Sequence, residues 1–170
     1  MDSQPTVNVV LVAPEIPQNT GNLIRLCANV GAHLHLVEPL GFQLNSPRLR
    51  RASLDYSDIV ETKVHNSIQE YLDTVCIDSV YGAVVSGSVP YTNPNYKPGD
   101  TIVFGSESVG LSKDVVKTLR RENRVHIPMM PANRSLNLSN AAAIIVYEMW
   151  KQIGFSGTSN DIDQPPSYFS

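Results

Sequence analysis

Short apolar runs rich in β-branched residues alternate along the chain with segments whose apolar residues recur at helical spacing. A buried strand is predicted at residues 7–13, and alternation of apolar and polar residues predicts another at 33–37; residues 60–63 could form a strand, and further strands are predicted at 80–85, 101–104 and 124–127. The other segments predict helices at residues 21–30, in a short stretch that starts at Pro47, and at 68–74, 113–121 and 140–154. Strands and helices that alternate at this spacing predict an α/β fold, in which a parallel sheet carries helices on both faces.

Capping residues set the expected ends of these helices. Thr20 is expected to cap the first long helix, and Gly31 is expected to end it. Ser67 and Glu70 form a capping-box pattern ahead of a later helix. Ser112 is expected to cap the helix that follows residues 105–110.

The last helix stands apart because residues 141–147 carry no charge. A helix that is apolar on every side is expected to be buried on every side. Ser139 or Asn140 can cap it, and a loop of hydrogen-bonding residues, 133–137, comes directly before it. A polar loop at the mouth of a buried helix predicts a rigid small-molecule pocket. A core helix preceded by an ordinary polar turn is the structural alternative.

Length and charge narrow the class of protein. A chain of 170 residues fits one domain, expected over residues 1–154, and the Ser-, Asp- and Pro-rich residues 155–170 are expected to form a disordered tail. The net charge of −3 and the pI near 5.7 favour neither a nucleic-acid-binding nor a membrane protein. The two cysteines fit no metal or redox spacing, and the sequence contains no signal-peptide pattern and no apolar run of membrane-spanning length. We therefore expect a cytoplasmic protein.

Ligands of parallel sheets bind beyond the carboxyl ends of the strands. The loops that follow the predicted strands ending at Ala13, Val85, Phe104 and Ile127 all carry Gly, Pro or concentrated polar groups. The chain has no G-x-G-x-x-G motif after its first strand and no G-x-x-x-x-G-K-[ST] motif. The ordinary dinucleotide and P-loop modes of binding are therefore excluded.

Two further groups of residues suit a ligand. The run NTGN at residues 19–22, with Arg25 one turn later, places amide and guanidinium donors at a helix N-terminus, which suits a phosphate. Helix capping and an ion pair of Arg25 are the alternative. Gly105 and Gly110 allow a ligand to approach the backbone on either side of Glu107, although an ordinary glycine-rich turn explains them equally well.

Two residue types that bind metals are expected to be structural. His33 and His35 share one face of a predicted strand, but no third ligand lies near them in sequence, so we expect no metal site. Cys27 falls on the apolar face of the first long helix and is expected to be a small core residue.

Taken together, three motifs resemble those of the SPOUT superfamily of knotted methyltransferases, over residues 7–154. The first is N-T-G-N-x-x-R at 19–25, and the second is F-G-x-E-x-x-G at 104–110. The third combines I-P-M at 127–129 with S-L-N-L-S at 135–139. The segments E-P-L-G-F at 38–42 and R-R-A-x-L-D-Y at 50–56 make the chain most similar to the minimal bacterial tRNA 2′-O-methyltransferases of the anticodon wobble nucleotide, which have no added RNA-binding domain.

The resemblance implies a parallel sheet flanked by helices with a C-terminal trefoil knot, the SPOUT fold, although threaded chains are otherwise rare. It implies a homodimer that uses S-adenosylmethionine to methylate the ribose of a wobble cytidine or uridine in the anticodon stem-loop of tRNA, notably of leucine tRNAs. The cofactor contacts that it implies are Ala83, Gly105, Ile127, Ser135 and Leu136. The catalytic positions that it implies are Arg25, Asn19, Glu107, Ser135 and Asn137.

The family assigns to Arg25 a part in removing the proton of the 2′-hydroxyl, together with a phosphate of the substrate. A guanidinium hardly deprotonates in proteins, so a literal base is not the expected role. Binding of the phosphate and stabilisation of the developing alkoxide are physically easier.

The acidic net charge is a mild objection to a tRNA substrate, and two local basic clusters answer it. One consists of Arg48, Arg50 and Arg51. The second cluster consists of Lys113, Lys117, Arg120, Arg121, Arg124 and Arg134. A solvated helix face is the alternative for either cluster.

A catalytically silent RNA-binding relative and an α/β protein that binds another nucleotide are the alternative functions. The intact motif residues argue against the silent relative.

Overall fold

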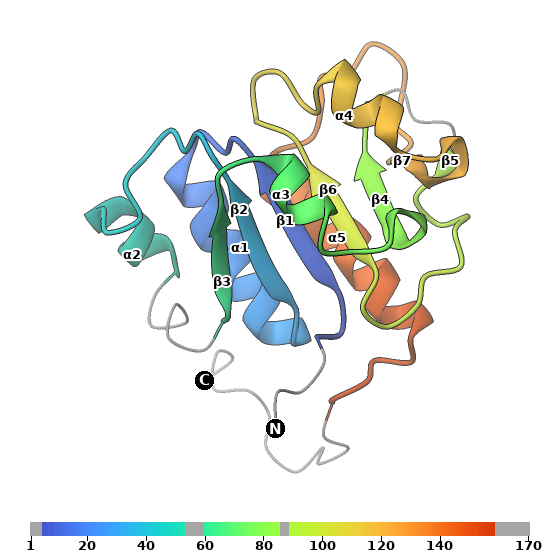
Figure 1. Cartoon of the computed structure of the whole chain (residues 1–170), viewed down its shortest axis with the longest axis horizontal. Helices are drawn as coiled ribbons and strands as arrows, with labels where there is room; N and C mark the ends of the chain where they lie inside the picture. The colour runs from blue at the N-terminus through green and yellow to red at the C-terminus, as the bar shows by residue number, and fades with distance from the viewer. Residues whose placement is uncertain (1–4, 54–59, 86–88, 159–170) are drawn as a thin grey trace.

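The computed structural model describes residues 5–53, 60–85 and 89–158. Within these residues, seven strands form one sheet in the order β3-β2-β1-β6-β4-β7-β5, and every neighbouring pair is parallel (Figure 1). This confirms the predicted parallel α/β fold. The strands are β1 (Asn8–Val12), β2 (His33–Val37), β3 (Thr62–His65), β4 (Val80–Ala83), β5 (Val89–Pro90), β6 (Thr101–Phe104) and β7 (Arg124–His126).

Helices cover both faces of the sheet (Figure 1). The two long helices, α1 and α5, contact each other on one face, and α2 packs on the outside of α1. The short helix α3 lies on the opposite face, and α4 lies at the end of the sheet where β4 and β6 terminate. The helices are α1 (Pro17–Val30), α2 (Pro47–Ser53), α3 (Ile68–Leu72), α4 (Lys113–Thr118) and α5 (Leu138–Gln152), with 3₁₀ turns at Ile77–Ser79 and Arg121–Asn123.

The central strand β1 divides the core into two parts. Val9 and Leu11 are fully buried in the cluster that contains α1 and α5. Val10, between them, is buried in a second cluster with Tyr71 and Leu119 on the other face. This alternation follows from the pleat of a strand that is covered on both sides. The sheet is therefore a rigid support for the loops at its carboxyl edge.

The start of α1 differs from the prediction. The helix begins at Pro17 rather than at Gly21, and its N-cap, Ile16, makes no side-chain capping bond. The expected cap, Thr20, is instead buried inside the helix, so that prediction was wrong. Pro17 suits the first turn because its fixed φ is helical and its missing N–H needs no partner there. The predicted end is confirmed, since Gly31 has a φ of 69° and donates its backbone N–H to Cys27.

The start of α5 also differs from the prediction. Its N-cap is Asn137, whose Oδ1 accepts the backbone N–H of Ser139 at 2.9 Å and that of Asn140 at 3.4 Å. Within a single chain the helix is not buried on every side, because Ile144 is 37% exposed and Tyr147 is 43% exposed. The uncharged stretch 141–147 therefore has one face in the core and one face outside it.

Other boundaries shift by two or three residues. The helix after Ser112 ends at Thr118 instead of Arg121, and β3 starts two residues later than predicted. The short strand β5 was not predicted; it pairs with β7 at the edge of the sheet, where Pro90 is tolerated. The predicted caps Ser67 and Ser112 are confirmed by bonds from Glu70 and Val115. The predicted tail lies mostly outside the described residues.

In the described part of the chain, no helix combines the length and the apolar character needed to cross a lipid bilayer. The same residues contain no group of three potential metal ligands. His35 is buried and lies 3.0 Å from Nε2 of His65 through its Nδ1, while its Nε2 lies 3.3 Å from Oδ1 of Asn8. His35 therefore belongs to the packed polar interior. The trefoil knot stays a prediction.

Candidate functional site

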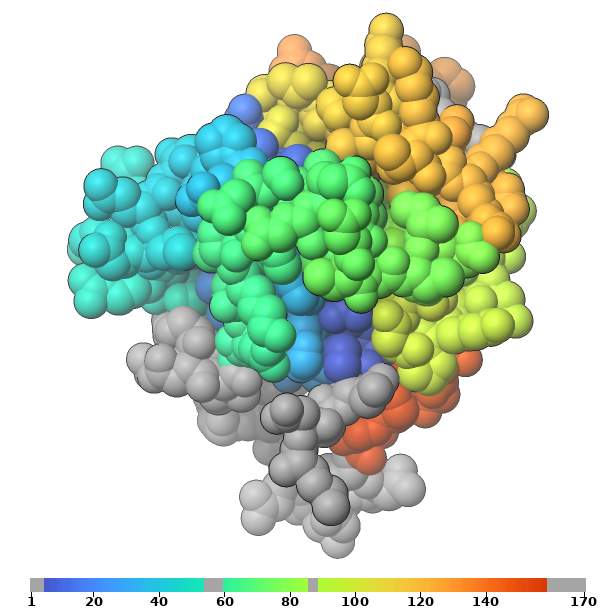
Figure 2. Space-filling view, viewed as in Figure 1, coloured from blue at the N-terminus to red at the C-terminus, as the bar shows by residue number. Residues whose placement is uncertain are grey.

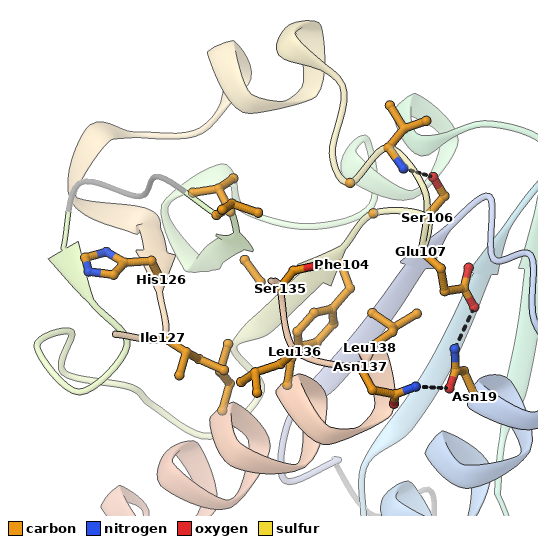
Figure 3. Close-up of a pocket in the computed structure, with 18 of the residues that line it drawn as sticks. Asn19, Phe104, Ser106, Glu107, His126, Ile127, Ser135, Leu136, Asn137 and Leu138 are labelled. Carbon is orange, nitrogen blue, oxygen red and sulfur yellow. Dashed lines mark hydrogen bonds between the residues drawn. The ribbon is translucent and has the colours of Figure 1, made fainter. Parts of the chain in front are cut away.

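A cavity of about 430 Å³ lies beyond the carboxyl ends of β4, β6 and β7, within the size range of small-molecule sites. Its wall includes residues 104–110 after β6 and residues 135–138 before α5, which Figure 3 shows facing each other. Segments that are far apart in the sequence therefore meet at one edge of the sheet, as parallel sheets require.

The structure brings together nearly all of the site residues that the sequence predicted. One exception is Arg25, which is exposed on α1 and does not line the cavity. The predicted residues that do line it are Asn19, Ala83, Gly105, Glu107, Ile127, Ser135, Leu136 and Asn137.

Three of these residues form a continuous hydrogen-bonded chain across the site (Figure 3). Nδ2 of Asn137 donates to Oδ1 of Asn19 at 3.0 Å, and Nδ2 of Asn19 donates to Oε1 of Glu107 at 3.1 Å. Asn19 is only 4% exposed, so both ends of its amide are satisfied within the protein. This chain ties the loop before α5, the first turn of α1 and the loop after β6 into one unit.

Glu107 also holds the start of α1. Its Oε2 accepts the backbone N–H of Glu15 at 2.7 Å, and its Oε1 accepts that of Ile16 at 3.0 Å. A carboxylate at a helix N-terminus satisfies N–H groups and is stabilised by the helix dipole. Glu107 is thus the cap that α1 lacks in its own sequence, and its contacts here are to protein groups.

Gly105 serves a different purpose from the one expected. A Cβ atom built there would lie 1.9 Å from the carbonyl carbon of Gly110 and 2.1 Å from the backbone nitrogen of Leu111. The space beside Gly105 is therefore taken by its own loop, which corrects the prediction that it is kept for a ligand. Ser106 and Gly110 form an antiparallel bridge, so the loop folds tightly back on itself.

The rest of the wall is mostly apolar. Phe104, Leu138 and Ile145 line it together with Ala83 and Ile127. Such a wall suits a neutral ring rather than a charged group.

His126 contributes to the residues around the cavity, and its ring points away from the other labelled lining residues (Figure 3). Nδ1 of His126 is buried and has no hydrogen-bond partner among the described residues. The cavity wall itself combines apolar side chains with the polar side chains of Ser135 and Asn137, so the residues present fit a ligand with both apolar and polar parts.

Asn22 and Arg25 share one exposed face of α1, in the turns that follow the cavity-lining Asn19. Asn22 is exposed on this face and donates to Oγ of Ser139 at 3.4 Å, which links α1 to the start of α5. Arg25 is exposed one turn further along α1. On the other side, Gly21 packs so closely on α2 that a Cβ atom would lie 2.3 Å from Cβ of Ala52. The arginines of α2 are therefore carried by a helix fixed to α1.

The two basic clusters differ in how much of their charge is already paired. In the 113–134 cluster, Arg120 forms an ion pair of 2.6 Å with Asp78, and Lys117 lies 3.6 Å from Asp114. Arg124 donates two hydrogen bonds to the carbonyl of Leu119. The side chains of Arg48, Arg50 and Arg51 on α2 are all exposed, and Figure 2 shows α2 projecting at one edge of the molecule.

Sequence reasoning missed several residues of the site. The pattern at residues 124–127 predicts only a strand for His126, and the glycine-rich run 105–110 singles out neither Ser106 nor Val109. Glu15 was also missed, although its carboxylate binds Ser108 in the cavity wall. Its position directly after a strand-ending proline, at the carboxyl edge, is the one signal that pointed to it.

Comparison with known proteins fits this geometry. Residues 6–147 match the model of the SpoU rRNA Methylase family. The tRNA (cytidine(34)-2′-O)-methyltransferase of Burkholderia ambifaria is 50% identical over 152 residues, which cover 88% of this chain and 97% of that protein. The enzyme of the same name from Escherichia coli K12 is 42% identical over 151 residues, which cover 89% and 96%.

Solved structures of RNA methyltransferases are also similar to this chain. A structure from a study of the 2-OH methylation of C/U34 on tRNA matches with a TM-score of 0.79 and 37% identity, over 88% of this chain and 97% of that one. An RNA 2′-O ribose methyltransferase matches with a TM-score of 0.77 and 26% identity, over 89% of this chain and 58% of that one. The family resemblance seen in the three motifs is thereby confirmed: the chain belongs to the SpoU rRNA Methylase family.

Proposed function

We propose that this protein transfers a methyl group from S-adenosylmethionine to the ribose 2′-hydroxyl of the wobble nucleotide of tRNA, cytidine or uridine at position 34. The observation that carries the proposal is the identity of 50% with a tRNA (cytidine(34)-2′-O)-methyltransferase over nearly the whole of both chains. Leucine tRNAs are the proposed substrates, and the cytoplasm is the proposed location.

The cavity fits the proposed cofactor. Apolar residues such as Phe104 and Leu138 suit the adenine ring, and the polar residues Ser135 and Asn137 lie in the same wall. Ala83, Gly105, Ile127 and Leu136 complete the contacts proposed from the motifs. The cofactor supplies an electrophilic methyl group, so much of the protein's task is to hold the ribose oxygen in line with it.

Arg25 is proposed to bind a phosphate of the tRNA and to stabilise the alkoxide that forms at the 2′-oxygen. Its guanidinium remains charged and offers several donors in a fixed plane. Its exposure on α1 leaves it accessible to RNA. Loss of one such donor costs on the order of a hundredfold in rate, so Arg25→Lys should slow single-turnover methylation strongly and leave cofactor affinity unchanged. Lys97→Arg, a charge-conserving change at an exposed position outside the cavity and outside both basic clusters, is the control.

Phosphate contacts are proposed to come first from α2. Arg48, Arg50 and Arg51 give three exposed positive charges on one short helix, whereas ion pairs already engage part of the 113–134 cluster. Each phosphate contact adds to the salt dependence of binding. Replacing the three arginines with Gln should therefore flatten the salt dependence of tRNA binding more than replacing Lys117 and Arg120.

A homodimer is proposed on the basis of α5. Ile144 and Tyr147 are exposed apolar side chains on a helix that is otherwise largely buried. Exposed apolar surface of this kind is typical of an interface. Light scattering should show a dimer for the wild type and a monomer for Tyr147→Glu. Val64→Glu, at an apolar side chain that is 41% exposed on the edge strand β3, should stay dimeric.

Ribose methylation of cellular tRNA tests the proposed function. A strain that lacks this gene should lose 2′-O-methylation at nucleotide 34 of its leucine tRNAs, and a plasmid copy of the gene should restore it. A catalytically silent RNA-binding relative would leave the methylation in place. Loss of methylation at another nucleotide would replace the proposed target.

A further inference from the structure

Two glutamates exchange bonds between the start of α1 and the loop after β6. The carboxylate of Glu107 accepts the backbone N–H groups of Glu15 and Ile16. In return, the carboxylate of Glu15 accepts the hydroxyl of Ser108 at 2.6 Å and the backbone N–H of Ser108 at 3.1 Å. The two segments are thus joined by hydrogen bonds in both directions: Glu107 accepts bonds from the segment before α1, and Glu15 accepts bonds from the loop after β6. Glu107 belongs to a family motif, but Glu15 and Ser108 lie outside the positions assigned so far.

The loop that Glu15 holds is rigid within itself. The backbone N–H of Gly110 donates to the carbonyl of Ser106 at 2.8 Å, and that of Val109 donates to Oγ of Ser106 at 3.3 Å. Gly105 packs directly against Gly110. A loop that is tight internally moves as one piece, so its bonds to α1 decide where it stands relative to the rest of the cavity.

The backbone of Glu15 is held in place by the loop after β2, which contains Gly41. A Cβ atom at Gly41 would lie 2.8 Å from Cα of Glu15 and 3.0 Å from its carbonyl oxygen. The backbone N–H of Gly41 also donates to the carbonyl of Pro14 at 2.9 Å. The loop after β2 therefore presses on the backbone of Glu15, and its side chain is directed from a supported position toward Ser108.

We propose that Glu15 is a positioning residue, which acts through Ser108 to fix the cofactor loop 105–110 against the helix that carries Arg25. The inference rests on the proposed function, because it takes the cavity as the site of S-adenosylmethionine. Glu15 touches neither cofactor nor reacting atoms in this account. It sets the distance between the methyl donor and the substrate-binding helix.

Calorimetric titration with S-adenosylhomocysteine is the first measurement. Because both bonds between Glu15 and Ser108 are exposed to solvent, and only part of their free energy reaches the cofactor, their loss should lower affinity by less than about tenfold. Glu15→Ala should therefore bind S-adenosylhomocysteine about five-fold more weakly than the wild type. Glu15→Gln keeps one acceptor and should recover part of that loss. The combination of Glu15→Ala with Ser108→Ala should be no weaker than Glu15→Ala alone, because both changes break one connection.

Glu70→Ala is the matched control. The Glu70 carboxylate also accepts a backbone N–H, that of Asn66 at 2.7 Å, and a side-chain amide at 3.1 Å, but it lies on α3 and does not line the cavity. Its loss should leave the affinity for S-adenosylhomocysteine within about twofold. Melting curves of all variants separate loss of folding from loss of binding, and Glu15→Gln serves if Glu15→Ala does not fold.

Unchanged affinity in folded Glu15→Ala or Glu15→Gln would overturn the inference. Losses from Glu15→Ala and Ser108→Ala that simply multiply would also overturn it, because they would show independent action. The proposed function has a separate test, methylation of nucleotide 34 by the wild type. The protein could fail that test while the two residues still showed their coupling, so the two outcomes are distinguishable.

Discussion

The side-chain amide of Asn137 donates a hydrogen bond of 3.0 Å to Oδ1 of Asn19, although 118 residues separate the two in the chain. This bond joins Asn137, the N-cap of α5, to the first turn of α1. Asn19 passes the connection on to Glu107, and all three side chains line the cavity. The site is thus held by a polar network whose members come from three separate motifs.

Asn19→Asp should break this network. The new carboxylate would keep an acceptor for Asn137 but would stand where Asn19 now donates to Oε1 of Glu107 at 3.1 Å. Repulsion between the two carboxylates and a lost buried bond should cost about 1–3 kcal/mol in the free energy of unfolding. Urea unfolding at pH 7 measures the loss. Because a protonated carboxyl can donate again, the loss should shrink as the pH falls into the carboxylate range.

Asn66→Asp is the control for that change. Asn66 also donates from its side-chain amide to a glutamate, Oε2 of Glu70 at 3.1 Å, but the pair is exposed. Solvent should screen the new repulsion there. A loss for Asn66→Asp as large as that for Asn19→Asp would contradict the importance given to burial of the network.

Gly105→Ala should disrupt the cavity more than Gly82→Ala. At Gly105 the added methyl group meets backbone, the carbonyl carbon of Gly110 at 1.9 Å. At Gly82 it meets the end of a side chain, Cδ1 of Leu119 at 2.3 Å, which can shift more easily. Gly105→Ala should therefore abolish binding of S-adenosylhomocysteine or prevent folding. Gly82→Ala should lower the melting temperature and retain binding; equal binding by the two variants would be the contrary result.

Stability should fall in acid because of His35. Burial lowers the pKa of His35 from 6.5 to about 4, with a further contribution from the positive charge of His65 nearby. The unfolded chain binds a proton at His35 below about pH 6.5, whereas the folded protein resists it until about pH 4, so stability is lost as the pH falls between these values. The loss from this group is at most about 3 kcal/mol.

A variant isolates the contribution of His35 from that of the carboxylates. His35→Gln has no charge to gain, so its stability should fall less than that of the wild type between pH 6.5 and pH 4. Urea unfolding of both proteins across this range gives the difference. Parallel pH profiles for the two proteins would show that His35 does not account for the acid sensitivity.

The sequence predicted much of the fold because its strong signals are local. The strand β2 lies where its alternating pattern predicts it, β6 lies where its β-branched run predicts it, and Gly31 ends α1 as predicted. The carboxyl-edge rule and the three motifs then placed the site. Local sequence signals did not predict the contacts that residues distant in the sequence make. Pro17 is a local signal for the start of α1, but the cap of this helix comes from Glu107, which lies far away in the sequence.

Two further expectations depend on contacts that a local sequence pattern does not reveal. Gly105 looked like a site of ligand approach, but the space beside it is filled by Gly110 of its own folded-back loop. The uncharged stretch of α5 predicts burial on every side; Tyr147 is exposed within one chain, so burial of that face by a partner subunit stays a prediction. A periodic pattern of apolar residues does not show whether a loop folds back on itself. It also does not show which surface covers a given face of a helix.

Transfer of a tritiated methyl group by the purified protein tests the central claim most directly. The substrates are two forms of a leucine tRNA that carries its natural base modifications, one with a ribose and one with a 2′-deoxyribose at nucleotide 34. The account predicts that label from S-adenosylmethionine enters the first tRNA at nucleotide 34 and does not enter the second. Equal labelling of the two forms, or labelling confined to another nucleotide, would contradict it.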